Sequence, residues 1–438
     1  MAFESEDIRK RQQRRKQDDM NRRKRQQHQR RRLILGLAAA AVVLALCGIL
    51  ILLLQQGSTP APTEPSTEIT QPAENTQPTE PETVINIAFG GDVNITDNVV
   101  AAGATGNGYD YTDVLLDIAP VLSGADAAVV NLEGNLYGAP YGTQSSSAPQ
   151  ELMNALAAAG VDLVQMANSC AINNGMTGLQ QTLDGIRQAG MEPVGAYATN
   201  AEFEESRGFT LRSINGVKVA FVAFTKGFIK DTEEDTESLR LPLGSEHCVN
   251  VLYKDYTSTY SEINTEGITR ILQAAEREQP DVTIALLHWG SSYNGIVSDS
   301  QKKIVKLMQQ QGVDAIIGTH SHYVQTVEYD AEKGTLVAYS LGDLLGDADK
   351  NYTNASTILQ LQITKDNTTG TAAITGYAHT PVYIATPKKD GVQDIKLLRI
   401  EQAIAAYEAN SIHKVSDETY TAMKSALNRI KSLLEPEE

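Results

Sequence analysis

The sequence of 438 residues predicts an α/β fold, a layered domain that follows one transmembrane helix. Three observations predict it. Short apolar runs alternate with helical stretches from residue 84 to about residue 390, an order typical of layered α/β domains. An uncharged apolar segment, Leu33–Leu54, comes before this region, and a Pro/Thr/Glu-rich stretch separates the two. The composition, 41% hydrophobic and 21% charged, excludes a wholly disordered, collagen-like or disulfide-stapled chain.

Residues 1–32 form a basic arm that we expect to be cytoplasmic. They hold 13 of the 37 Lys and Arg residues and 5 of the 54 Asp and Glu residues, a net charge of about +8. The other 406 residues keep 24 basic and 49 acidic side chains, a net charge of −25. Because basic residues beside a transmembrane helix stay in the cytoplasm, the arm predicts an extracellular C-terminal domain. We expect the arm to contact anionic lipid headgroups of the bilayer and no nucleic acid.

Leu33–Leu54 is predicted to anchor the chain in the cell membrane as a single-pass, type II helix. Its 22 residues are enough, at about 1.5 Å per residue, to cross a hydrocarbon core of ~30 Å. A cleavable signal peptide is the weaker alternative, since its apolar region has only ~7–15 residues. Leu46 is too large to precede a lipoprotein cysteine, so we interpret Cys47 as a membrane-buried side chain. A disulfide between Cys170 and Cys248 stays open.

Residues 55–83 are predicted to be an extracellular linker. Within them, Gly57–Thr83 contains six Pro, seven Thr and five Glu and no basic residue. Such a segment has too little apolar surface to fold. Its prolines favour an extended, polyproline-like spacer that holds the next domain away from the bilayer.

The domain of residues 84–390 is predicted from buried strands that alternate with helices. The strand candidates are short, apolar and bounded by Gly, Asp, Asn or Pro: Val84–Phe89, Ala127–Val130, Leu163–Ala167, Val217–Phe224, Val282–Leu287, Ala315–Ile317 and Thr335–Tyr339. The helix candidates are Ala148–Ala159, Gly178–Ala189, Thr265–Glu278 and Ser300–Gln311, and Gly160 and Gly190 terminate the first two. Residues 391–438 are predicted to form a C-terminal extension of amphipathic helices, over Ile395–Glu438.

Polar residues recur at the C-terminal ends of the predicted strands, the edge where open α/β sheets bind ligands. They are Asp92, Asn131, Glu133, Asn168, Ser169, Cys170, His288, His320 and His322. Carboxylates with imidazoles are ligands that Mn, Fe or Zn ions accept. Two such ions, ~3.5–4 Å apart, would clamp a phosphoryl oxygen and activate a water. A lone histidine at a strand end is more often an interior side chain, but the pair His320 and His322 beside two carboxylates favours a divalent metal site.

Five motifs occur in the order and spacing of a known family: Gly90-Gly91-Asp92, Asn131-Leu132-Glu133, His288-Trp289-Gly290, Gly318-Thr319-His320-Ser321-His322 and Tyr339-Ser340-Leu341-Gly342. Over roughly Ile85–Ala385 the chain resembles the CapA family of capsule-synthesis proteins, within the metallophosphatase-like (calcineurin-like) superfamily. The resemblance implies a four-layer α/β/β/α sandwich, a membrane-anchored location and a role in making or exporting an anionic surface polymer, typically poly-γ-glutamate. It implies metal ligands among Asp92, Asn131, Glu133, Ser169, His288, His320 and His322, with His288 also a catalytic candidate.

The third motif departs from the family pattern. The family usually has Asn-Asn-His after the third strand, where this chain has Asn168-Ser169-Cys170. The second Asn corresponds to a metal ligand, and the His to the group that stabilises the transition state or protonates the leaving oxygen. Serine is a weak ligand, and a thiol at Cys170, the catalytic position, does not replace imidazole as a general acid. Asn173-Asn174 and Asp343 also stand where Asp-Tyr and Asn are more common.

Three functions follow as hypotheses. The first is a membrane-anchored extracellular protein of capsule or poly-γ-glutamate synthesis or export, working with other membrane subunits and in contact with an anionic polymer. The second is a metal-dependent phosphoesterase acting on an envelope phosphate ester. The third is a catalytically dead scaffold with the same fold. The sequence leaves enzymatic activity open because the degenerate third motif predicts feeble hydrolysis.

Overall fold

The computed structural model describes residues 82–231, 236–389, 392–412 and 414–435. The predicted basic arm, the predicted transmembrane helix and the linker up to residue 81 lie outside the described residues. None of the described helices combines the length and the apolar composition that crossing a bilayer requires.

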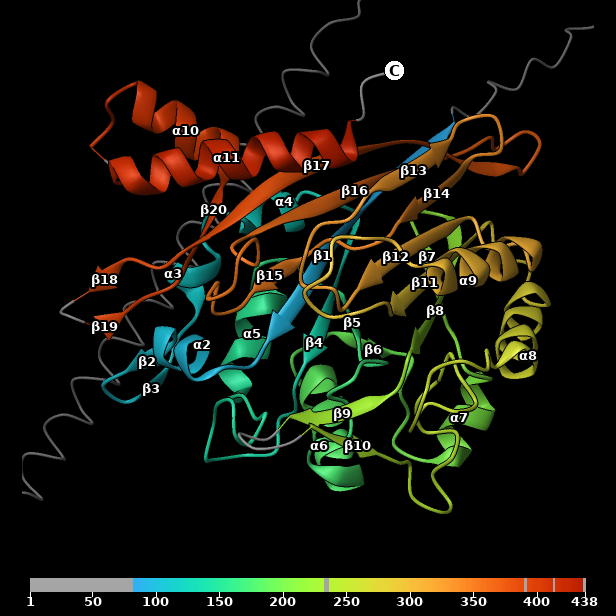
Figure 1. Ribbon diagram of the computed structural model, residues 1–438. Coiled ribbons are helices and arrows are strands. Elements are labelled where there is room, and N and C mark those ends of the chain that lie inside the picture. The colour runs from blue at the N-terminus through green and yellow to red at the C-terminus, as the bar shows by residue number, and fades with distance from the viewer. Residues whose placement is uncertain (1–81, 232–235, 390–391, 413, 436–438) are drawn as a thin grey trace, which may run out of the picture. The chain divides into compact units, whose positions relative to one another are not determined.

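The first of two large sheets carries the N-terminal strand of the domain near its centre (Figure 1). Its strand order is β20 (Lys396–Arg399), β17 (Ala372–Ala385), β16 (Ala355–Lys365), β1 (Thr83–Asn94), β4 (Ala127–Glu133), β5 (Leu163–Gln165) and β6 (Glu192–Val194). The strands from β1 to β6 run parallel, and the short β15 (Asp343–Leu345) also pairs in parallel with β1. All seven residues of β4 are buried, as expected for a parallel strand covered on both faces.

The second sheet has a parallel centre and two antiparallel edge strands. Its order is β13 (Val327–Asp330), β14 (Thr335–Ala338), β12 (Ala315–Thr319), β11 (Val282–His288), β8 (Val217–Thr225) and β7 (Thr210–Ile214). Among the described residues, three two-stranded antiparallel sheets lie outside the large sheets: β2 (Ala104–Thr105) with β3 (Gly108–Tyr109), β9 (Phe228–Asp231) with β10 (Thr236–Leu239), and β18 (Lys388–Lys389) with β19 (Val392–Gln393).

Helices cover the outer faces of both sheets, so the layers are helices, sheet, sheet and helices (Figure 1). The second sheet is covered by α8 (Thr265–Glu276) and α9 (Asp299–Gln310), and α9 begins at a capping box made by Ser298 and Gln301. The other helices are α2 (Asp97–Ala102), α3 (Thr112–Leu115), α4 (Ala119–Leu122), α5 (Gln150–Ala158), α6 (Gly175–Gln188), α7 (Asn200–Ser206), α10 (Ile400–Glu408) and α11 (Asp417–Leu434). Buried side chains of α5, α6 and α11 join the core of the first sheet.

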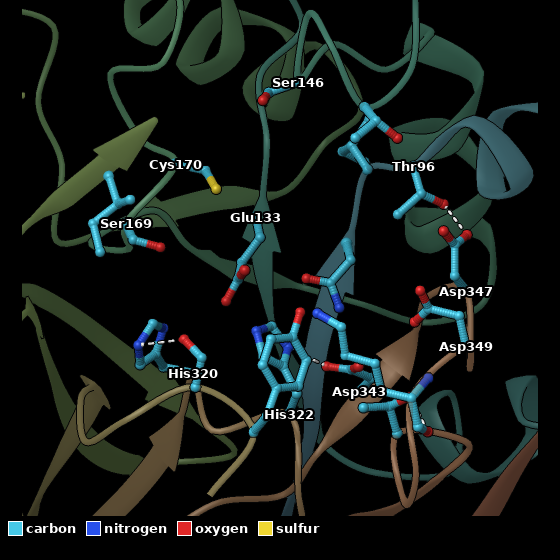
Figure 2. A pocket seen from close by; sticks show the side chains of 18 of the residues that line it. Thr96, Glu133, Ser146, Ser169, Cys170, His320, His322, Asp343, Asp347 and Asp349 are labelled. Carbon is cyan, nitrogen blue, oxygen red and sulfur yellow. Dashed lines mark hydrogen bonds and ion pairs between the residues drawn. The ribbon is translucent and has the colours of Figure 1, made fainter. Parts of the chain in front are cut away.

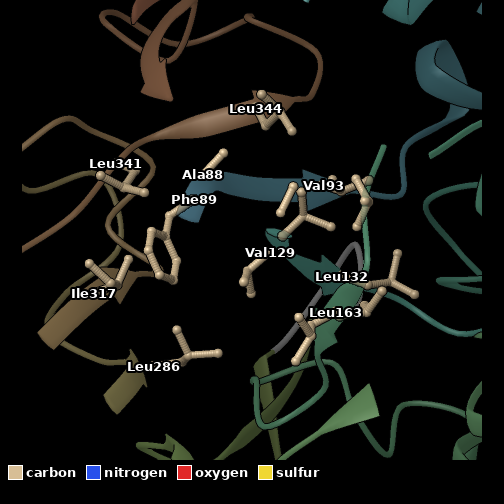
Figure 3. Close-up of a cluster of buried hydrophobic side chains, with 14 of the residues drawn as sticks. Ala88, Phe89, Val93, Val129, Leu132, Leu163, Leu286, Ile317, Leu341 and Leu344 are labelled. Carbon is tan, nitrogen blue, oxygen red and sulfur yellow. The ribbon is translucent and has the colours of Figure 1, made fainter. Parts of the chain in front are cut away.

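The two sheets face each other across a layer of buried apolar side chains. Figure 3 shows the ring of Phe89, from β1, lying near Ile317 of β12 and Leu286 of β11, with Val129 of β4 beside them. All four side chains are at most 3% exposed. This layer fixes the spacing between the sheets, and so the distance between groups that the two sheets carry at their edges.

Four aspartates form hydrogen bonds between neighbouring strands at the N-terminal ends of the parallel strands. Each stands one residue before a strand, and its carboxylate accepts a backbone N–H from the neighbouring strand: Asp126 from Asn86, Asp162 from Ala128, Asp281 from Lys218 and Asp314 from Thr283, at 2.7–2.9 Å. These bonds satisfy N–H groups that the sheet ladder leaves open and fix the register of the strands. The C-terminal ends of the same strands form the opposite edge of each sheet, which is the edge where open α/β sheets bind ligands.

Gly91 allows β15 to lie against β1. A Cβ atom at this position would be 1.7 Å from the carbonyl oxygen of Gly342, so no side chain fits. The backbone N–H of Asp92 donates a hydrogen bond of 3.0 Å to the same oxygen. The glycine therefore brings Asp343, which pairs in register with Asp92, into the same edge of the sheet.

The predicted elements are present, with one error at the C-terminus. All seven predicted strands and all four predicted helices occur with shifted ends, and Gly160 and Gly190 have the positive φ of helix-terminating glycines. The helix prediction over Ile395–Glu438 is wrong at its start, where β20 extends the first sheet. Ile395 and Leu397 are buried at alternate positions, the period of a strand. Cys170 and Cys248 form no disulfide with each other.

Candidate metal centre

Asp92 stands at the meeting point of the two sheets. Its side chain is fully buried at the end of β1. The Asn131 amide donates a hydrogen bond of 2.7 Å to Oδ1, and the backbone N–H of His320 donates one of 2.9 Å to Oδ2. The carboxylate therefore has a fixed orientation before any ligand arrives, as a metal ligand requires.

His320 and His322 follow β12 in an unusual backbone conformation. Their φ angles are 89° and 59°, in the left-handed region that residues with side chains rarely adopt. This turn directs both imidazoles into the centre, with ring centroids 6.0 Å apart. Such conformations are held only where the surrounding structure over-determines them, and they cluster at functional sites.

Six side chains form two adjacent groups, each able to hold one metal ion. The first group is Glu133, His288 and His320, and the second is Asp92, His322 and Asp343. Within each group the ligand atoms lie within 4.8 Å of one another. These residues come from both sheets. The first sheet contributes residues of β1, β4 and the short β15, and the second sheet contributes residues at the ends of β11 and β12. The sheet register explains the convergence, because Asp92 is paired with both Asn131 and Asp343.

The donor atoms of these residues fit a divalent cation. Glu133 Oε1 and His320 Nδ1 are buried without a hydrogen-bond partner among the described residues. A buried polar atom without a partner is costly in free energy, and metal coordination removes that cost. Mixed carboxylate and imidazole ligands suit Mn, Fe or Zn and do not distinguish among them.

Burial and neighbouring charges shift the pKa values of these groups in opposite directions. Burial raises the pKa of Asp92 to about 6, and burial together with the charge of Asp92 raises that of Glu133 well above its ordinary value. Burial lowers the pKa of His288 and His320 well below the ordinary value, which keeps both imidazoles neutral. Burial also lowers the pKa of His322, but the adjacent carboxylates, Asp343 foremost, outweigh it and raise the value well above the ordinary one.

The third motif lies beside the first group. Ser169 Oγ is 3.1 Å from His288 Nε2, and Asn168 donates to Asn131 Oδ1 at 3.1 Å and to the Leu132 carbonyl at 2.6 Å. The Asn131 side chain thus donates a hydrogen bond to Asp92 through its amide nitrogen, while its amide oxygen accepts a hydrogen bond from Asn168. Ser169 therefore contacts a member of the first group through its hydroxyl and belongs to neither group itself, so its predicted role as a ligand stays a prediction.

Two residues at the centre are missing from the sequence prediction of ligands. Asp343, considered only as a departure from the family pattern, is 2.8 Å from His322 Nδ1. Lys226 follows β8, and its Nζ lies 3.0 Å from both His320 Nε2 and the Gly290 carbonyl oxygen. Lys226 stands at the C-terminal end of β8, so the rule that identified Asp92 also applies to it. Asp343 begins β15 and reaches the same edge because β15 pairs with β1 at Asp92.

An open pocket of about 510 Å³ exposes the centre to ligands (Figure 2). Glu133, His320 and His322 lie at its base, with Ser169 and Cys170 on one wall. On the other side Thr96 donates a hydrogen bond to Asp347, and Asp349 lies next to them. Cys170 therefore lines the pocket, as its place in the third motif predicts, and its side chain there is a thiol and not an imidazole.

Comparisons with known proteins agree with the motifs. The family described as bacterial capsule synthesis protein PGA_cap matches residues 86–348. A capsule biosynthesis protein CapA of Bacillus anthracis is 27% identical over 231 residues, 52% of this chain and 50% of the relative. A PGA biosynthesis protein CapA of Bacillus subtilis is 25% identical over 244 residues, 54% of this chain and 56% of the relative. The chain thus spans about half the length of the curated relatives that it matches.

Solved structures are more distant. A phosphatase from Mycoplasma pneumoniae is 13% identical with a TM-score of 0.43, over 69% of this chain and 94% of that one. A calcineurin-like phosphoesterase from Bacillus subtilis is 15% identical with a TM-score of 0.41, over 80% of this chain and 100% of that one. The matched residues 86–348 contain all six candidate ligands, and this chain belongs to the PGA_cap family of bacterial capsule synthesis proteins.

Proposed function

We propose that this chain is a membrane-anchored envelope protein whose external domain acts in the synthesis or export of an anionic capsule polymer, poly-γ-glutamate. The observation that carries the proposal is the family match over residues 86–348, which contains both ligand groups and most of the residues lining their pocket. The two relatives bear the names of capsule and PGA biosynthesis proteins. The pocket would receive a segment of the polymer or of its precursor.

The anchoring part of the proposal rests on sequence. Leu33–Leu54 is uncharged and long enough to span a bilayer, and the basic arm before it favours a cytoplasmic N-terminus. A domain tethered in this way would work beside other membrane subunits of a polymer synthesis or export system, with the bilayer as its first partner.

The experiment that tests this function is deletion and complementation in the source bacterium. We expect the deletion strain to release or retain markedly less γ-glutamyl polymer than the parent, and the wild-type chain to restore it. A His320→Ala chain should restore less, since it loses a candidate ligand, whereas His247→Ala, an exposed histidine outside the centre, should restore fully. Unchanged polymer in the deletion strain would exclude the proposed role.

A metal-dependent phosphoesterase is the second candidate, favoured by the two adjacent ligand groups. A bound divalent metal would polarise a phosphoryl oxygen and lower the pKa of a water. Of the chain's own residues, Asp343 holds the His322 ring in place and Lys226 adds positive charge next to His320. Measured metal content together with turnover of a generic phosphodiester would favour this enzyme. The absence of both would favour a scaffold that binds polymer without chemistry.

A further inference from the structure

A second pocket, of about 430 Å³, continues the first one away from the candidate metal centre. The two pockets share Ala348, Asp349 and Lys350 in their linings. The far wall of the second pocket is α11, through side chains that include Ser425 and Arg429. Since α11 lies beyond residue 348, this wall comes from a part of the chain outside the family match.

Arg429 presents a guanidinium group without a carboxylate partner. Among the described residues, no Asp or Glu forms an ion pair with it, and its buried Nε has no hydrogen-bond partner. Its carbon Cζ lies 4.5 Å from the ring centroid of Tyr352, and Nη2 donates a weak hydrogen bond of 3.4 Å to the Tyr352 carbonyl. The aromatic ring therefore holds a planar, charged donor in place at the pocket wall.

Lys350 connects this wall to the candidate metal centre. Its Nζ lies 3.4 Å from the ring centroid of Tyr293, and that ring stacks on the imidazole of His322 at 4.8 Å between centroids and 22° between planes. In the part of the chain that the structure describes, Lys350 also lacks an ion pair with a carboxylate. Lys350 and Arg429, neither of which has an ion-pair partner among the described residues, therefore line one continuous groove. The residues after the basic arm carry a net charge of −25.

We propose that Lys350 and Arg429 form an oxyanion subsite that holds an anionic group of the substrate while a neighbouring part of the same molecule reaches the candidate metal centre. The proposal rests on the proposed function for the substrate itself, an acidic polymer chain whose anionic groups are carboxylates. A phosphate ester offers the same oxyanion chemistry. The guanidinium fork matches two oxygens of either group, and the lysine adds a point charge.

Two carboxylates also line the groove and limit where an anion can bind. Asp347 lines the first pocket, where its carboxylate accepts a hydrogen bond from Thr96, and Asp349 lines both pockets. Their negative charges repel a substrate carboxylate from their own positions. An acidic chain is therefore expected to place its anionic groups at Lys350 and Arg429, whose side chains the two tyrosine rings hold in position at low entropic cost.

Binding of a fluorescent γ-linked glutamate oligomer to the full-length chain, followed by anisotropy, tests the subsite. We expect Lys350→Met and Arg429→Met each to weaken binding about tenfold, the loss of one charge-assisted contact, and 0.5 M salt to weaken binding by the wild type. Lys424→Met is the matched control, because Lys424 lies on the same helix over the ring of Tyr420 at 5.3 Å and lines neither pocket. This control should bind as the wild type does.

The outcomes separate the subsite from the proposed function. Lys350 is exposed, so its substitution leaves folding intact, and wild-type oligomer binding by Lys350→Met would overturn the subsite whatever Arg429→Met does. A second titration uses inorganic phosphate as the competitor or sole ligand. If the wild type binds phosphate but no oligomer, and both variants lose phosphate, the oxyanion subsite stands and the polymer function fails. Binding of neither probe by the wild type would overturn the subsite.

Discussion

The backbone N–H of His320 donates a hydrogen bond of 2.9 Å to the carboxylate of Asp92, across 228 positions of sequence. This bond joins the edge of the second sheet to the edge of the first at the candidate metal centre. It fixes one carboxylate oxygen of Asp92 through the same residue whose imidazole belongs to the neighbouring ligand group. The two groups are therefore geometrically coupled, and a change at either residue is expected to affect both.

Metal content is the first test of the candidate centre. We expect His320→Ala to lower the bound metal of the purified full-length chain markedly, since the first group then keeps only two ligands. Elemental analysis of wild type and variant measures the effect, and His247→Ala, which changes a histidine outside the centre, serves as the control. A wild-type protein without stoichiometric metal would reject the site outright.

The altered third motif predicts weak phosphodiester hydrolysis by the wild type. Ser169→Asn combined with Cys170→His restores an amide next to His288 and an imidazole on the pocket wall, so turnover should rise at least about tenfold, the lower part of the range for a general acid. Steady-state rates with a generic phosphodiester measure it. Fast hydrolysis by the unmodified chain, abolished by His288→Ala, would instead rank the phosphoesterase first.

Topology is tested on intact, wall-stripped cells. Because the 13 basic residues of the arm resist translocation, protease added from outside should remove the folded domain and leave residues 1–32 protected. Immunoblotting with a tag at each end measures the outcome. A domain that survives protease until the cells are lysed contradicts the predicted orientation.

Asp314 predicts a pH-dependent stability. Burial raises its pKa to about 6 from an ordinary 3.8, so the folded state holds the proton more tightly than the unfolded state. Stability then falls as the pH rises from about 4 through 6, and ionisation disfavours the folded state above that window. Asp314→Asn removes this penalty. After a discount for partial exposure, we expect a gain of about 1–2 kcal/mol at pH 8 and none near pH 4.

Thermal unfolding of the full-length chain at both pH values measures this difference. Asp281→Asn is the matched contrast, since Asp281 accepts the same kind of strand hydrogen bond from Lys218 and also pairs with Lys365 at 2.7 Å. There the substitution removes an ion pair and should lower stability at pH 8. A stability gain from Asp314→Asn that is equal at pH 4 and pH 8 would rule out ionisation as its cause.

Much of the candidate centre could be predicted because it follows one topological rule. Asp92, Glu133, His288 and His320 end parallel strands whose apolar runs are plain in the sequence, and parallel strands bring their C-terminal ends to a shared edge. Asp343 was missed because β15 has only three residues and pairs in parallel with β1, although 248 residues separate the two strands in the sequence, and no local pattern reveals such a pairing.

Other misses have physical causes of the same kind. The strand β16 alternates buried and exposed residues only in its second half. In β17 the first nine residues are exposed or half-exposed except Ile374, so neither strand is a continuous apolar run over its whole length. Lys226 follows a clear strand, but a lysine in a sequence is usually a solvated surface charge. Only the fold shows that it turns inward to His320.

The close approach of Gly91 to the carbonyl oxygen of Gly342 determines which residues position 91 can accept. A saturation library at residue 91 should return glycine alone, since even a methyl group would separate β15 from β1 and move Asp343 away from Asp92. Leu243, with 97% of its surface exposed, should accept nearly every residue. A position without any side chain is thus under stricter selection than a large apolar residue, because backbone proximity there determines where a carboxylate can stand.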